Sequence, residues 1–206
     1  MQPATAQSLV LKRRKPPAPW RDEVEFVLIS EVQIARRVRQ LTTALERDYA
    51  GRELVIVALL SGTVMFLADL IRHLSLPLRL DFIGVSSYRA GTQAGELIFT
   101  KELRLDVQGR DVLVVDDILD TGRTLKRVTA KLQALRPRTL RACVLLDKTA
   151  RRIEPVQADY VGFKIPDLFV VGYGLDFAER YRNLPFIGVL KPELYQSKTS
   201  AGQPWR

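Results

Sequence analysis

Three aspartates within five residues form the densest group of reactive side chains in this sequence. The segment 112–125 reads VLVVDDILDTGRTL: Asp116 and Asp117 follow an apolar run, Asp120 comes three residues later, and Gly122 begins a helical pattern. Free N–H groups at a helix start, with hydroxyls beside a glycine, suit a phosphate. Carboxylates accept hydrogen bonds from sugar hydroxyls or bind Mg²⁺. The segment therefore predicts a ligand that joins a phosphate to a ribose, whereas helix capping explains only one of the acids.

Single copies of cysteine and histidine narrow the chemistry further. Cys143 has no second cysteine with which to form an internal disulfide, a CxxC redox pair or a multi-cysteine zinc site. His73 is the single histidine, so the usual histidine triads and poly-histidine zinc sites are not expected. The sequence also lacks the GxxxxGK[ST] and GxGxxG phosphate-binding patterns. Any reaction must therefore depend on carboxylates, lysines, hydroxyls and backbone groups.

The net charge of +9 is concentrated at the start of the chain. Residues 1–21 contain five basic residues and no acid, and the remainder has 27 basic against 23 acidic residues. Three prolines, Pro16, Pro17 and Pro19, lie close together near the end of residues 1–20, so we expect this segment to form a basic, poorly ordered tail. A solvated tail is the simpler interpretation, and binding of nucleic acid or another anionic partner is the alternative.

Apolar periodicity predicts the order of helices and strands. Ser30, followed three residues later by Gln33, is typical of a helix start, and Gly51 ends that helix. Continuous apolar runs are typical of strands buried on both faces. Helices are expected at 31–49, 65–74 and 121–135, and strands at 54–60, 80–85, 96–105, 112–115, 140–146, 160–162, 169–171 and 187–190, with a loop at 86–95. This alternation predicts an α/β fold in which helices flank a mainly parallel, twisted sheet.

The length of 206 residues, 47% of them apolar and 27% charged, fits one domain or one domain with a small appendage. The beginning of the sequence lacks the continuous apolar segment of a secretory signal. The most apolar stretch, 54–68, is shorter than the ~20 residues that span a bilayer. We therefore expect a cytoplasmic protein with no membrane partner.

Five segments resemble, in order and spacing, the hypoxanthine-guanine branch of the type I phosphoribosyltransferases. The run VVDDILDTGRTL resembles the motif that binds phosphoribosyl pyrophosphate (PRPP) in the wider family. ALLSGTVMFLADL at 58–70, SSYRAGT at 86–92, LLDK at 145–148 and the segment 159–195 resemble the purine-specific branch. The resemblance covers about residues 24–195 and implies a core at 31–164, a small hood from about 21–30 and 165–206 within a domain at 21–195, and a C-terminal tail at 196–206.

The resemblance implies a purine salvage enzyme that transfers ribose 5-phosphate from PRPP to N9 of hypoxanthine or guanine. The products are IMP or GMP and pyrophosphate, Mg²⁺ is the cofactor, and a homodimer or homotetramer is expected. Asp120 would be the general base for N7 of the purine, and Asp116 and Asp117 would hold the ribose hydroxyls beside Mg²⁺. Asp176 would lie near a second Mg²⁺. The 5′-phosphate would be held by Thr121, Gly122, Arg123 and Thr124.

The purine and the pyrophosphate are assigned to other segments by the same resemblance. Lys148 would donate to O6 of the base, Phe169 would stack on its ring, and the Val170 backbone would meet its edge. Arg182, Ser61 and Gly62 match the positions that contact pyrophosphate. Ser87 and Tyr88, after Ser86, match a loop that closes over the site, which would exclude water from the reactive ribose carbon.

One departure and two alternatives stay open. The family usually has lysine before Gly62, in a peptide that can be cis, and Ser61 stands at that position here. The affinity for pyrophosphate and a contact between subunits are therefore in question. A phosphoribosyltransferase for another base is one alternative, which Lys148 argues against. The second is a regulator of the same fold that senses PRPP or nucleotides and binds nucleic acid through the basic tail.

Overall fold

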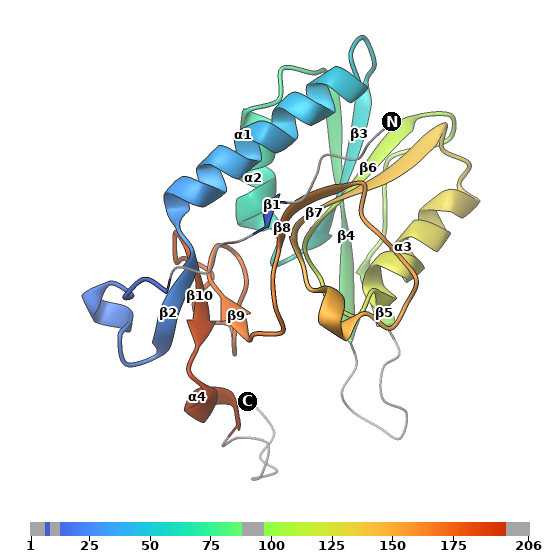
Figure 1. The fold of residues 1–206 in the computed structure, drawn as a ribbon. Coiled ribbons are helices and arrows are strands. Elements are labelled where there is room, and N and C mark those ends of the chain that lie inside the picture. Colours follow the sequence, from blue (N-terminus) through green and yellow to red (C-terminus); the bar gives the residue numbers. More distant parts are fainter. Residues whose placement is uncertain (1–6, 9–12, 88–96, 197–206) are drawn as a thin grey trace.

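A seven-stranded sheet is the centre of the computed structural model, which describes residues 7–8, 13–87 and 97–196 (Figure 1). Its strand order is β1-β8-β7-β6-β3-β4-β5, and every pair is parallel except β4 with β5. The helices are α1 (Glu31–Asp48), α2 (Val64–Arg72), α3 (Arg123–Ala134) and α4 (Pro192–Gln196), with 3-10 turns η1 (Ala18–Trp20) and η2 (Thr149–Arg151). The strands of this sheet are β1 (Gln7–Ser8), β3 (Leu54–Leu60), β4 (Leu78–Ser87), β5 (Leu97–Lys101), β6 (Asp111–Leu119), β7 (Thr139–Asp147) and β8 (Tyr160–Lys164).

Helices cover both faces of this sheet, as Figure 1 shows. Along β3, Ile56 and Ala58 pack in one core cluster with residues of α1 and α2, while Val55 and Val57 pack in the other with residues of α3. Side chains alternate between the two faces of a strand, so a strand covered on both sides needs apolar residues throughout. The prediction of a mainly parallel α/β sheet flanked by helices is confirmed.

Several element boundaries match the prediction, and others move by a few residues. The helix start at Ser30 is a capping box in which Gln33 Oε1 lies 3.0 Å from the Ser30 backbone nitrogen. The strands at 54–60 and 187–190 have the predicted bounds. The strand predicted at 112–115 continues to Leu119, because Asp116 and Ile118 still pair with β7. The helix predicted from residue 121 begins at Arg123, after Gly122 in the left-handed region.

The region around the predicted loop also differs from expectation. Ser86 and Ser87 belong to β4, in which they pair with Ile98 and Leu97, so the loop predicted from residue 86 begins later. The strand predicted at 96–105 is antiparallel, as expected, but it spans only Leu97–Lys101. Residues 88–96 lie outside the described part of the chain.

A second, three-stranded sheet joins segments that are far apart in the sequence. Its order is β2 (Val24–Ile29), β10 (Ile187–Leu190) and β9 (Val170–Val171), all antiparallel, and we call it the hood sheet. Its own apolar cluster includes Val24, Val171 and Leu184. In Figure 1 the hood sheet lies beside the N-terminal end of α1.

Parts of the expected lead-in have regular structure. Gln7–Ser8 pairs in parallel with β8, and the Arg14 carbonyl accepts a hydrogen bond of 2.8 Å from the Val27 backbone nitrogen. Arg13 lies over the Phe26 ring at 4.9 Å. These contacts place Arg13 and Arg14 against the hood sheet.

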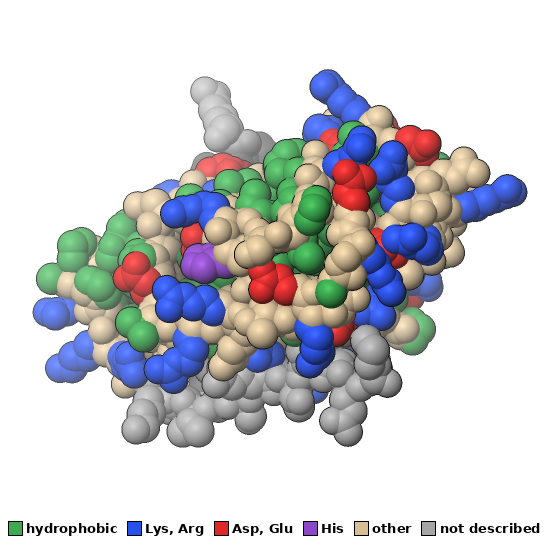
Figure 2. Space-filling view, turned by 90° about the horizontal axis from the view of Figure 1, so that it is seen from above, with side chains coloured by type: hydrophobic (Ala, Val, Ile, Leu, Met, Phe, Trp, Pro, Cys, Tyr) green, Lys and Arg blue, Asp and Glu red, His purple; other side chains and the backbone are tan. Residues whose placement is uncertain are grey.

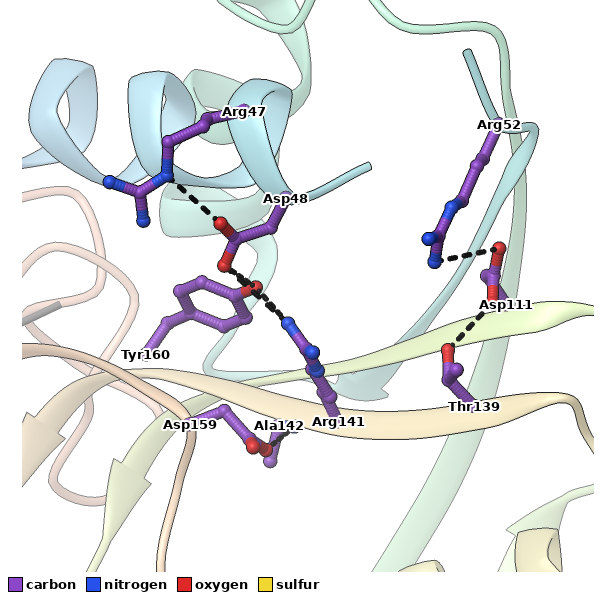
Figure 3. A network of polar contacts seen from close by, with 9 residues as sticks. All are labelled: Arg47, Asp48, Arg52, Asp111, Thr139, Arg141, Ala142, Asp159 and Tyr160. Atoms are coloured by element: carbon purple, nitrogen blue, oxygen red, sulfur yellow. Dashed lines mark hydrogen bonds and ion pairs between the residues drawn. The ribbon is translucent and has the colours of Figure 1, made fainter. Parts of the chain in front are cut away.

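Ion pairs tie together the loops at the amino ends of the parallel strands. Asp111, at the start of β6, accepts a hydrogen bond from Thr139 and lies 3.9 Å from Arg52, as Figure 3 shows. It also pairs with Arg138. Nearby, Asp48 accepts hydrogen bonds from Tyr160 and Arg141. The face seen from above in Figure 2 shows Lys and Arg side chains in separate groups with Asp and Glu between them.

None of the helices in the described ranges is both long and apolar enough to cross a membrane.

Arg37 joins α1 to the sheet through buried hydrogen bonds. Its guanidinium donates to the carbonyls of Gly162 at 2.8 Å and Val161 at 2.7 Å, and the residue is 6% exposed. We expect Arg37→Met to lower the free energy of unfolding by about 1–3 kcal/mol, since it leaves buried carbonyls without these donors. Urea unfolding measures the change. Arg36→Met, one residue earlier on the exposed face, is the control and should change it by less than about 0.5 kcal/mol; equal losses in both variants would contradict the assignment.

Candidate functional site

Three neighbouring strands bring predicted site residues to one edge of the sheet. β3 ends just before Ser61 and Gly62, β6 ends just before Asp120, and β7 ends just before Lys148. In the sheet, β6 lies between β3 and β7 and is parallel to both. The carboxyl ends of parallel strands form the edge at which ligands bind in open α/β sheets. The fold therefore gathers these residues where such a site is expected.

Asp116 and Asp117 are two carboxyl groups held together within the end of β6. Asp116 is 8% exposed, and its Oδ1 accepts a hydrogen bond of 3.0 Å from the Asp117 backbone nitrogen. The Thr63 hydroxyl, at 3.4 Å, donates to the same oxygen. Burial raises the pKa of Asp116 well above its ordinary range, and the neighbouring Asp117 charge adds to the effect. Burial also raises the pKa of Asp117, against the lowering influence of hydrogen bonds and of Arg182.

Two glycines allow two loops to meet beside these acids. A Cβ added to Gly62 would lie 1.8 Å from Asp117 Oδ2, and one added to Gly174 would lie 1.9 Å from the Gly62 carbonyl oxygen. No side chain fits at such distances, so the loop after β3 lies directly between Asp117 and the loop around Gly174. The peptide between Leu60 and the exposed Ser61, at the start of this loop, is cis.

Asp120 lies in the turn between β6 and α3 with one carboxylate oxygen buried. Among the residues that the structure describes, Oδ1 has no hydrogen-bond partner, and Oδ2 lies 3.5 Å from Arg151 Nη1. The turn is completed by Gly122, whose φ of +86° is favourable only for glycine. A buried carboxylate oxygen without a partner is costly unless a ligand donates to it.

The predicted phosphate-binding residues follow in the same turn. Thr121 and Thr124 are half-buried, and Arg123 is exposed as the first residue of α3. The Thr121 carbonyl accepts hydrogen bonds from the backbone nitrogens of Ile153 and Glu154, at 2.9 and 3.0 Å. The segment after β7 thus holds the backbone of the turn at Thr121, next to the start of α3.

Lys148 follows β7 and is buried, with 5% of its surface exposed. Its ammonium lies 3.2 Å from Oδ1 of Asp167, which is the ion-pair partner. Its backbone nitrogen donates to the Leu119 carbonyl at 3.0 Å, which fixes Lys148 beside the end of β6. A buried lysine with one carboxylate partner still has donor capacity for a second acceptor.

An aromatic group lies at the hood sheet. The Phe169 ring stacks on Tyr195 with centroids 4.6 Å apart and meets Phe177 edge to face at 5.5 Å. Val170, the next residue, belongs to β9 and is buried. These contacts hold the Phe169 ring from two sides.

Asp176 and Arg182 form an ion pair near Gly174. Arg182 Nη2 lies 3.0 Å from Asp176 Oδ1, and Nη1 donates to the Gly174 carbonyl at 2.9 Å. Glu179 is a second carboxylate partner of Arg182 at 3.0 Å. In the described ranges, no group of three or more His, Cys, Asp or Glu residues is arranged to hold a metal ion by itself. Asp176 thus pairs with an arginine here.

Two predicted site residues lie at or beyond the limit of the described chain, and three contacting residues were not predicted. Ser87 is described only by its backbone in β4, and Tyr88 lies outside the described residues. Three residues that were not predicted from the sequence each contact a predicted site residue: Thr63, Asp167 and Arg152. Thr63 could have been predicted, because it follows Ser61 and Gly62 at the end of a buried strand. The other two contacts depend on chain segments that only the tertiary structure brings together.

Comparison with known proteins identifies the family. Residues 29–178 match the phosphoribosyl transferase domain. The hypoxanthine-guanine phosphoribosyltransferase of Staphylococcus aureus is 46% identical over 177 residues, which cover 85% of this chain and 99% of that protein. The bifunctional protein TilS/HprT of Listeria monocytogenes is also 46% identical, over 84% of this chain but only 27% of its own length. The chain belongs to the phosphoribosyltransferase family, in its hypoxanthine-guanine branch.

Solved structures agree with this assignment. A hypoxanthine phosphoribosyltransferase from S. aureus has a TM-score of 0.82 at 46% identity, over 86% of this chain and 97% of that one. A hypoxanthine phosphoribosyltransferase from Trypanosoma cruzi has a TM-score of 0.81 at 38% identity, over 87% and 98% of the two chains. The predicted relationship to enzymes of this type is confirmed.

Replacing Asp116 by asparagine should stabilise the protein without ligand at neutral pH. The folded protein holds a proton on Asp116 more tightly than the unfolded chain does, so this group destabilises the fold as pH rises above the ordinary aspartate value of about 3.9. Asp116→Asn removes that penalty. We expect a melting temperature a few degrees higher at pH 7, since ~1 kcal/mol corresponds to about 2–4 °C, and little difference at pH 4.

Asp111→Asn is the matched control on the same strand. The hydrogen bond from Arg138 lowers the pKa of Asp111, so loss of its charge should reduce the melting temperature at pH 7. A lower melting temperature for Asp116→Asn at pH 7 would contradict the prediction that the Asp116 carboxylate destabilises the fold.

Proposed function

We propose that this protein transfers the 5-phosphoribosyl group from PRPP to N9 of hypoxanthine or guanine, forming IMP or GMP and pyrophosphate. The observation that carries the proposal is the buried Oδ1 of Asp120, which has no hydrogen-bond partner among the described residues and lies in the turn between β6 and α3. The named relatives support purine salvage by a PRPP-dependent transferase.

Asp120 is the general base of the proposed reaction. A carboxylate that accepts the proton from N7 of the purine raises electron density on N9, which then attacks C1′ of the ribose as pyrophosphate leaves. Such a base typically contributes ~10²–10⁴-fold to the rate. Oδ1 has no partner in the described part of the chain, which supports this role, because a purine N–H would supply a donor there.

Different residues bind the ribose and the 5′-phosphate of the phosphoribosyl group. The two acids accept hydrogen bonds from the ribose hydroxyls, and those donors relieve the repulsion of two buried carboxylates. Thr121, Gly122, Arg123 and Thr124 hold the 5′-phosphate with backbone N–H groups at the start of α3 and with side-chain donors. Arg182, Ser61 and Gly62 contact the pyrophosphate.

The carboxylates present fit Mg²⁺ that arrives with PRPP. Mg²⁺ prefers oxygen ligands and is usually held by one or two carboxylates together with substrate phosphates. Asp116 and Asp117 supply such oxygens at the end of β6, and Asp176 supplies another beside Arg182. When bound, Mg²⁺ supplies positive charge that stabilises the leaving pyrophosphate.

Lys148 and the hood residues select a 6-oxopurine. The Lys148 ammonium is a donor only, so it pairs with a carbonyl oxygen at C6 and leaves the amino group of adenine without an acceptor. Its burial supports this discrimination, because an unpaired polar group costs more out of water. Phe169 stacks on the purine, and the backbone of Val170 meets its edge.

The remaining expectations also form part of the proposal. The segment that contains Ser87 and Tyr88 closes over the bound substrates, the protein acts in the cytoplasm, and it assembles as a homodimer or homotetramer. Residues 1–20 and 196–206 flank the catalytic domain.

Asp120→Asn should lower kcat by about 10²–10⁴-fold with hypoxanthine or guanine, because an amide cannot accept the N7 proton. Initial rates of IMP and GMP formation from PRPP and Mg²⁺ measure the loss, and adenine should give little AMP. Asp106→Asn, on the loop before β6, is the control and should retain full activity. Absence of product with every purine in the unmodified protein would overturn the proposed function, and a change below about threefold would overturn the role of Asp120.

Ser61→Lys should strengthen binding of pyrophosphate. The new ammonium would restore the charge that relatives usually carry before Gly62, and a charge-assisted hydrogen bond corresponds to about a tenfold gain. Product inhibition by pyrophosphate measures the affinity. Ser61→Met provides similar length without charge, and equal effects of the two substitutions would show that charge at this position does not matter.

A further inference from the structure

We propose that Arg152 is a positioning residue that fixes the turn carrying Asp120 and the phosphate-binding residues. The inference rests on the phosphoribosyl transfer proposed above, in which Asp120 has to meet a purine while the next residues hold PRPP. Arg152 lies in the segment between β7 and β8, just after η2. It belongs to neither the base-binding nor the phosphate-binding set.

The Arg152 guanidinium bonds to four acceptors around the turn. Its Nε donates to the Asp120 carbonyl at 3.0 Å, and its Nη2 donates to the Leu119 carbonyl at 3.1 Å. Nη1 donates to the Val156 carbonyl at 2.6 Å, and Nη2 also meets Asp147 Oδ1 at 2.5 Å. Because the guanidinium is planar and presents its donors in fixed directions, these bonds define the positions of all four acceptors at once.

Packing against Gly122 adds a second constraint. A Cβ on Gly122 would lie 3.0 Å from Arg152 Cδ and 2.8 Å from Val156 Cγ2, so the aliphatic part of Arg152 closes one side of the turn. Only 17% of the Arg152 side chain is exposed. The side chain therefore touches the turn on both sides of Thr121, through main-chain atoms of Asp120 and through Gly122.

The neighbouring Arg151 makes a different contact. It is 51% exposed and reaches the Asp120 carboxylate itself, at 3.5 Å. Arg152 bonds to Asp120 through the carbonyl of that residue, so loss of Arg152 leaves the Asp120 carboxylate and its charge unchanged and releases the backbone that orients it. The effect of Arg152 should thus be on geometry. A misplacement of about 1 Å in an active site can reduce the rate about 10²-fold.

Substitution of Arg152 tests the inference in two independent ways. In Arg152→Met, we expect kcat per folded protein to fall about tenfold to a hundredfold, while affinity for the purine changes little. Arg152→Lys should recover part of the rate, because lysine keeps a charge near Asp147 but cannot reach every carbonyl. Hydrogen exchange, read by mass spectrometry, should show faster exchange in peptides covering 119–126 and 150–156.

Arg138→Met is the matched control at the opposite end of β6. Arg138 pairs with the buried Asp111, so its loss weakens the same strand away from the turn. Unchanged exchange at 119–126 in Arg152→Met would overturn the positioning role, whatever the activity. Loss of kcat equal to that of Arg138→Met would also overturn it, because general destabilisation would then explain the effect. If the unmodified protein makes no nucleotide, the proposed function fails, and exchange at the turn still decides the role of Arg152.

Discussion

Repulsion between two adjacent carboxyl groups, one buried and one half-buried, is the constraint on which the organisation of this site depends. The apolar part of β6 is covered on both faces by helices, and the strand ends in Asp116 and Asp117, where burial and the neighbouring charge raise the pKa of Asp116. A sheet of this kind gains stability from apolar side chains and none from such a pair. The end of β6 is thus matched to a ligand that brings hydroxyl donors and positive charge.

Close contacts hold the loops around these two acids together. Gly62 and Gly174 have no side chains, so the loop after β3 and the loop near Arg182 approach Asp117 closely. Arg152 and the backbone after β7 hold the turn on the other side of the strand end. Polar groups at the opposite edge of the sheet pair with one another, as Asp111 does with Arg138. Among the described residues, the buried polar atom without a partner at the carboxyl edge of the sheet is Oδ1 of Asp120.

The sequence allowed the framework to be predicted better than its contacts. Leu54–Leu60 was located because a strand buried on both faces is apolar throughout, and the helix from Glu31 because Ser30 and Gln33 form a local capping pattern. The end of β6 was placed too early, since the charge of Asp116 interrupts the apolar run while the strand pairing continues. The roles of Lys148 and Asp120 came from resemblance. Their partners Asp167 and Arg151 were not foreseen, because no local pattern encodes contacts between separate segments.

The hood sheet has a consequence for how the protein matures during synthesis. Its central strand, Ile187–Leu190, pairs with Val24–Ile29 on one side and with Val170–Val171 on the other. A ribosome therefore produces β2 early and has to add more than a hundred further residues before the partner of β2 exists. The parallel core can begin to assemble from β3 onward in that interval, because domains fold progressively as the chain emerges. The apolar cluster under β2 closes last, so a chain that stops before residue 187 exposes it and is a natural target for quality control.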